Sequence, residues 1–192
     1  MKKISISLLF VASGLSFQSS TWAQMSSGFP TLCQTGEFAF LNARLGKFEK
    51  QGKGYNLKQT GKIISLCADK PKEPFSKFFY RFGTIGNVEM EQVATSNARF
   101  GIYNRSTTPK TGENIFSFTN GNFNYYVAEA TGMGSGISVM AYKSDKRIAS
   151  YFSGNDNEYQ SNLEEVDFDK ARSPVFMKKA LKNNLDDTLR FE

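Results

Sequence analysis

Hydrophobic and polar residues alternate along most of this chain. Between Gly36 and Phe152, short stretches rich in aromatic and β-branched residues are separated by turn residues, and a period of two is typical of half-buried strands. No stretch between them has the length and periodicity of a crossover helix, so the pattern predicts antiparallel pairing. The predicted strands are residues 37–44, 62–68, 77–82, 87–93, 99–103, 114–118, 122–130, 136–143 and 147–152.

The same alternation predicts which side of each strand is buried. One face carries Phe78, Tyr80 and Phe82; the others carry Phe123, Tyr125 and Val127, and Ile137, Val139 and Ala141. The pair Asn120-Gly121 predicts a tight type I′ turn, and Ser144-Asp145-Lys146 a second hairpin. We therefore predict an all-β fold, an antiparallel meander of about eight or nine strands that forms either a barrel or a two-layer sandwich. The sequence leaves both open.

Two polar segments and the C-terminal part interrupt this pattern. Residues 51–61, which contain three glycines, and residues 104–112 are predicted to be loops and candidate contact surfaces. Residues 155–192 begin as a polar connection, and Ser173-Pro174 has the form of a helix N-cap followed by proline. An i+4 apolar series predicts a C-terminal helix with its lysines in water. The series is Met177, Leu181, Leu185 and Leu189.

The N-terminal residues predict export. Lys2 and Lys3 precede an apolar run over residues 4–17, and Thr21-Trp22-Ala23 ends with the small residue that a cleavage site requires. Residues 1–23 are therefore predicted to be a signal peptide cleaved after Ala23. The run is too short for a membrane span. Residues 24–192 are then expected to be a single mature domain, periplasmic or secreted.

The residue types that are present and absent limit the chemistry. Cys33 and Cys67 are the only cysteines, and in an oxidising compartment we expect them to form a disulfide. The chain has no histidine, which excludes serine–histidine and cysteine–histidine catalysis and histidine-ligated zinc. No cofactor or metal site is predicted, and we expect the protein not to be an enzyme.

A carboxylate pair for glycoside cleavage would need two acids facing one bond. The candidates Glu164, Glu165, Asp167 and Asp169 lie in a polar connecting stretch without an apolar neighbour that would raise one pKa. We interpret them as solvated. The net charge of +6 is spread along the chain, often beside acids, so nucleic-acid binding is not expected.

Three residues are candidates for contact with a partner. Arg81 interrupts an aromatic strand and is expected on its exposed face, where arginine is favoured at binding hot spots. The alternative is a cross-strand ion pair with Glu89 or Glu91. Met133 and Ser135 lie in a glycine-rich segment, residues 132–136, that is expected to be a hairpin tip.

Parts of the sequence resemble a known family. Gly61-Lys62-Ile63-Ile64-Ser65-Leu66-Cys67 and Tyr80-Arg81-Phe82-Gly83 resemble the GKxxSLC…YRFG signature of an uncharacterised family of small exported proteobacterial proteins. The resemblance spans about residues 33–150 and implies export, but no activity.

These observations favour a non-enzymatic periplasmic or secreted binding protein, expected to be an inhibitor or immunity-type partner of an envelope-targeting enzyme. A stapled β scaffold with polar loops and no catalytic constellation supports it. The alternative is a β-barrel that carries a small apolar ligand or lipid in its aromatic interior.

Overall fold

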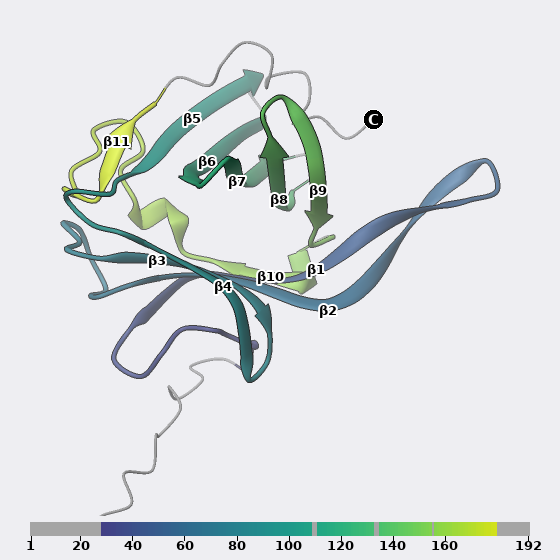
Figure 1. The fold of residues 1–192 in the computed structure, drawn as a ribbon, viewed down its shortest axis with the longest axis horizontal. Helices are drawn as coiled ribbons and strands as arrows, with labels where there is room; N and C mark the ends of the chain where they lie inside the picture. The colour runs from purple at the N-terminus through teal and green to yellow at the C-terminus, as the bar shows by residue number, and fades with distance from the viewer. Residues whose placement is uncertain (1–27, 109–110, 133–134, 155, 180–192) are drawn as a thin grey trace, which may run out of the picture.

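The computed structural model describes residues 28–108, 111–132, 135–154 and 156–179. Within them the chain forms one sheet of eleven strands, in the order β11-β5-β6-β7-β8-β9-β1-β2-β3-β4, with β10 paired to β1 (Figure 1). All the pairs are antiparallel except β11 with β5. The strands are β1 (Phe38–Gln51), β2 (Gly54–Ala68), β3 (Phe78–Thr84), β4 (Asn87–Ala94), β5 (Phe100–Thr108), β6 (Thr111–Asn120), β7 (Phe123–Gly132), β8 (Gly136–Lys143), β9 (Lys146–Phe152), β10 (Tyr159–Ser161) and β11 (Phe176–Lys178).

The sheet curls until its two halves face each other. Strands β1–β4 form one half and β5–β9 the other, joined where β9 meets β1 through the single pair Gly46↔Phe152. The path ends at β4 and β11 without closing. The all-β prediction is confirmed. The described strands form neither a closed barrel nor two separate sheets, since one open sheet supplies both layers.

Rings from the two halves meet in the core. Phe78 of β3 stacks on Phe116 of β6 with ring centroids 5.5 Å apart, and Tyr80 lies 4.8 Å from Phe118. Each of these four side chains is buried. The predicted inward faces of β3, β7 and β8 are correct at most positions, since Val127, Ile137 and Val139 belong to the same core and Phe82 and Tyr125 pack against it. Phe123 is half-buried and lies outside this core.

All nine predicted strands are found, but several are longer than predicted. Residues 51–61 are not a loop: β1 runs to Gln51 and β2 begins at Gly54, with a turn at Gly52 and Lys53. Residues 104–112 likewise belong mostly to β5 and β6. Both predictions of loops were wrong because polar residues can occupy strands whose faces lie in water.

The turns are close to their predicted places. The β6–β7 turn falls on Gly121 and Asn122, one residue later than expected, and Gly121 takes the positive φ of 58°. The β8–β9 turn lies at Ser144 and Asp145 as predicted.

The predicted C-terminal helix is wrong where it can be compared. Phe176–Lys178 form strand β11 beside β5 instead of continuing a helix from Pro174. Phe176 is buried among core rings, so tertiary packing overrides the local helix signal. The rest of that prediction, residues 180–192, and the signal peptide, residues 1–23, lie outside the described residues. Over the described part, no helix has the length and hydrophobicity to cross a membrane.

Candidate functional site

The distal parts of β1 and β2 form a hairpin that projects from the body, here called the arm and defined as residues 46–59 (Figure 1). Its register runs from Gly46↔Gln59 to Gln51↔Gly54, after an irregularity between Leu45 and Gly46. Gly46 is needed at this point, because a Cβ there would lie 2.8 Å from Leu57 Cδ1 and 2.9 Å from the Lys58 carbonyl oxygen. The arm therefore leaves the sheet at a bulge that only glycine fits closely.

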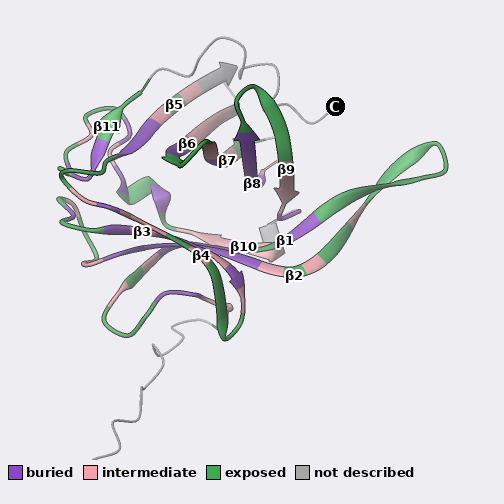
Figure 2. Ribbon diagram, in the orientation of Figure 1, coloured by how far each residue is buried: buried purple, intermediate pink, exposed green. Residues whose placement is uncertain are grey.

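The two faces of the arm differ. Phe48 pairs with Leu57, and Lys50 with Tyr55, so these four side chains share one face. Phe48 is 46% exposed and Tyr55 68%. At the base, the Phe48 ring stacks on Phe152 at 5.8 Å. An apolar stripe thus runs from the body toward the tip on a segment that Figure 2 shows as largely exposed.

The arm is also basic, with four lysines and one glutamate. Lys58 pairs with Glu49 at 3.4 Å, and Lys47 Nζ lies 4.7 Å above the ring of Tyr151. Lys50 and Lys53, near the turn, make no ion pair within the described part of the chain. The tip therefore presents positive charge beside an exposed aromatic ring. The sequence pattern predicts a candidate contact surface over residues 51–61 but not the strands that carry it. The alternation of Tyr55 and Leu57 opposite Phe48 is the signal that could have revealed these strands.

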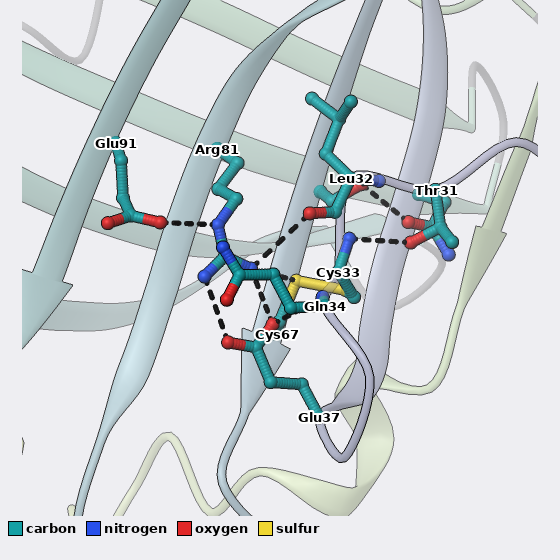
Figure 3. Close-up of a disulfide and its surroundings, with 10 residues drawn as sticks. Thr31, Leu32, Cys33, Gln34, Glu37, Cys67, Arg81 and Glu91 are labelled. Carbon is teal, nitrogen blue, oxygen red and sulfur yellow. Dashed lines mark hydrogen bonds and ion pairs between the residues drawn. A yellow bond between two sulfur atoms is a disulfide. The ribbon is translucent and has the colours of Figure 1, made fainter. Parts of the chain in front are cut away.

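At the opposite end of β1 and β2, Arg81 lies in a buried ionic cluster (Figure 3). Its guanidinium donates to both carboxylate oxygens of Glu37, and its Nε donates to Glu91 Oε2 at 2.5 Å. One nitrogen also donates to the Leu32 carbonyl oxygen at 3.3 Å and lies 3.6 Å from Cys67 Sγ. Arg81 thus ties the N-terminal segment to β3 and β4.

Arg81 is 1% exposed, so the prediction that it lies on an exposed face is wrong. The predicted face of the strand is correct, since the Arg81 side chain points away from the core rings of β3. The segment that contains Leu32 and Glu37 covers that face and shields Arg81 from water. Burial lowers its pKa, and the hydrogen bonds to Glu37 and Glu91 outweigh this, so the pKa is raised and the guanidinium stays charged. The alternative prediction, an ion pair with Glu91, is correct; the second acid, Glu37, was missed because it is remote in sequence.

The predicted disulfide joins Cys33 to Cys67, with the Cα atoms 5.7 Å apart. Beside it, Ser65 Oγ accepts from the Leu32 N–H at 2.9 Å and donates to Asn42 at 2.7 Å. Glu37 lies close to both sulfurs, but the sulfurs are bonded to each other and the carboxylate is held by Arg81. This cluster is structural and does not form a metal site.

Ser135, the other predicted contact residue that the structure describes, lies in the opposite half of the sheet from Arg81. Ser135 is half-buried and immediately precedes β8, and its N–H donates to the Gly132 carbonyl oxygen at 3.2 Å. Met133 lies outside the described residues.

A polar pocket of about 590 Å³ lies between β5, β6 and the 163–172 segment. Desolvation raises the pKa of Glu73 despite hydrogen bonds from Ser173 and the Asp167 backbone. The N–H of Lys170, at 2.9 Å, lowers the pKa of Asp167, which also pairs with Arg172 at 2.8 Å. These bonds fold the segment upon itself, so we interpret the pocket as part of the scaffold. Its lining includes Glu164, Glu165, Asp167 and Asp169, the acids considered from sequence.

Comparison with known proteins gave no relative: no family model, no curated protein and no solved structure matches the chain.

Proposed function

We propose that the protein is an exported, non-enzymatic binding protein that inserts its arm into the cleft of an envelope-targeting enzyme, as an inhibitor or immunity-type partner. The observation that carries this is the projecting hairpin with an exposed aromatic ring, Tyr55, and the cations Lys50 and Lys53 at its tip. Binding hot spots favour tyrosine. Long projecting loops are known to insert into concave sites, and a narrow hairpin has the same shape.

The charge of the tip suggests the class of partner. Glycan-cleaving enzymes use two carboxylates that flank the scissile bond, and complementary charge speeds association and favours the matching partner. A lysine-bearing tip therefore suits a carboxylate-lined cleft. The disulfide and the Arg81 cluster stabilise the opposite end of the same strands. The strands that carry the arm are therefore anchored in the body, and such preorganisation lowers the entropic cost of binding.

The test uses the mature protein, residues 24–192, against a panel of cell-wall glycan hydrolases, with inhibition and calorimetric affinity as readouts. Lys53→Glu combined with Tyr55→Ala is expected to weaken binding at least about tenfold. Lys146→Glu, an exposed lysine of the β8–β9 hairpin, is the matched control and should change affinity less than about twofold. Equal binding by the arm variant, or no binding to any enzyme of the panel, would contradict the proposal.

The alternative, a carrier of a small apolar ligand, is a separate hypothesis. A carrier would need space for the ligand between the two half-sheets. In the structure this space holds stacked rings, such as Phe78 on Phe116 and Phe100 on Phe118, the latter pair with centroids 4.9 Å apart. Native mass spectrometry of the purified protein distinguishes the two, since a carrier would retain a ligand of fixed mass and the proposed inhibitor would not.

A further inference from the structure

The outer face of the β5–β8 half-sheet carries a second apolar cluster, separate from the core. It consists of Ile115, Tyr126, Ala128, Met140 and Tyr142, with Tyr103 packed against it. The register aligns these residues on one side: Ser117 pairs with Tyr126, and Tyr126 with Met140. Core residues such as Val127 and Val139 alternate with them and point inward.

This cluster is more deeply buried than an open sheet face would be. Ile115 and Met140 are each 1% exposed, and Tyr142 is 2% exposed. Among the described residues, the hydrophobic side chains that form and flank the cluster all belong to β5–β8 themselves. An antiparallel sheet face that lies in water leaves its side chains partly exposed, so burial this complete indicates that another segment lies over the face.

The other half-sheet shows how such a face is covered. On the outer side of β2 and β3, the N-terminal segment lies over Arg81 and is attached through Cys33 and Glu37. The covering segment there precedes β1 and lies outside the sheet. The outer face of β5–β8 occupies, in the second half-sheet, the position that the outer side of β2 and β3 occupies in the first.

The C-terminal end of the described chain arrives at this second face. The Lys179 N–H donates to the Ile102 carbonyl oxygen of β5 at 3.2 Å. A Cβ placed on Gly101 would lie 2.9 Å from Lys179 Cδ. Gly101 pairs with Ser117, in the same outward row as Tyr126 and Met140. The chain therefore reaches the edge of the cluster at residue 179.

The remaining thirteen residues, 180–192, have a suitable length and pattern. Leu181, Leu185 and Leu189 recur at i+4, with Lys182 between them, and this spacing gives a helix one apolar side. Thirteen helical residues span about 20 Å at 1.5 Å per residue. Four strands at about 4.8 Å spacing span about 14 Å. The segment is long enough to cross β5–β8.

We propose that the outer face of β5–β8 is the docking surface for the chain's own C-terminal segment, residues 180–192, which lies across it as an amphipathic helix with its leucines against Ile115, Tyr126 and Met140. This contact is independent of the function proposed for the arm. It would make the C-terminus the counterpart of the N-terminal segment that covers the other half.

The test measures peroxide oxidation of Met140 in the mature chain by peptide mass spectrometry, because oxidation of methionine depends on exposure. Leu185→Asp is expected to speed Met140 oxidation at least about tenfold, whereas Asn183→Asp, about 160° around the helix from Leu185, should leave the rate unchanged. Met90, which packs against the main core, is the internal reference for an intact fold.

Three results would overturn the proposal. The first is Met140 that stays protected in Leu185→Asp, and the second is protection that disappears on dilution of the wild type, since a second copy would then be the cover. If Leu185→Asp also exposes Met90, the milder pair Leu185→Ala and Met140→Ala replaces it. If the two side chains touch, the change in the unfolding equilibrium constant of the double variant differs by at least about threefold from the product of the changes in the two single variants. A double-variant change equal to that product is the third contrary result.

Discussion

The two ends of the β1–β2 hairpin are built from the same pair of strands and differ in almost every physical property. Near Cys67 the hairpin is buried on both faces, one by core rings and the other by the N-terminal segment. In the arm, residues 46–59, most side chains lie in water on both faces (Figure 2). The difference shows that continuous strand pairing does not determine burial; what lies over each face does.

The charged side chains at the two ends differ in burial and in pairing. Arg81 is buried with two carboxylates and a carbonyl oxygen around it, whereas Lys50 and Lys53 make no ion pair within the described chain. Buried charges need partners, because removing one leaves the others desolvated and unpaired. Exposed charges need none and contribute little to stability. The comparison assigns stability to one end and contact to the other.

The largest expected effect is at Arg81. Arg81→Met removes the cation and leaves the Glu37 carboxylate, which is only 11% exposed in its side chain, without its partner. We expect a loss of about 3–5 kcal/mol in the free energy of unfolding, measured by urea titration. Lys62→Met is the control: it breaks the half-exposed Lys62–Glu89 pair and should cost less than about 1 kcal/mol. Equal losses from the two variants would contradict the assignment of stability to the Arg81 end.

The next largest effect is at the disulfide. The bond closes a separation of 34 residues, and replacing both cysteines by alanine is expected to cost about 3–4 kcal/mol, mainly by enlarging the unfolded ensemble. Because the bond also holds the segment that covers Arg81, the triple variant with Arg81→Met should lose less than the sum of the separate losses. Strict additivity in urea unfolding would show that the two features act independently.

These features could be predicted from the sequence to different degrees. The nine strands and the cysteine pair followed from alternation and from the expected compartment. The burial of Arg81 did not, because alternation gives the face of a strand and not what lies over it. The strand β11 was missed because Phe176 pairs with Phe100, a contact that no local pattern records. The arm was missed because its strands are polar, although its position was named as a contact surface.

An intermediate effect is expected at the boundary between the two ends. Gly46→Val places atoms where Leu57 and the Lys58 carbonyl oxygen already lie, the closest at 2.8 Å from the Cβ position. Relief requires a shift of backbone as well as of Leu57, so we expect a cost of about 1–3 kcal/mol. Gly54→Val is the matched control, because a Cβ there meets nothing within 4 Å. If Gly46→Val were as well tolerated as Gly54→Val, the junction would be looser than the geometry indicates.

The smallest effect on stability is expected at the tip of the arm, and it is the one that separates stability from contact most sharply. Tyr55 is 68% exposed and pairs only with Lys50 across the hairpin, so Tyr55→Ser removes little buried area and should change the free energy of unfolding by less than about 0.5 kcal/mol. Phe48→Ser, nearer the base, also removes a stacked ring from Phe152 and should cost more, about 1 kcal/mol, because an aromatic pair is lost together with some apolar burial. If the arm is stabilised only where it touches the body, the loss in the free energy of unfolding, measured by urea titration, increases from the tip variant to the base variant. A tip variant as costly as the base variant would mean that Tyr55 is needed for folding, and an exposed ring of that kind would no longer argue for a contact surface.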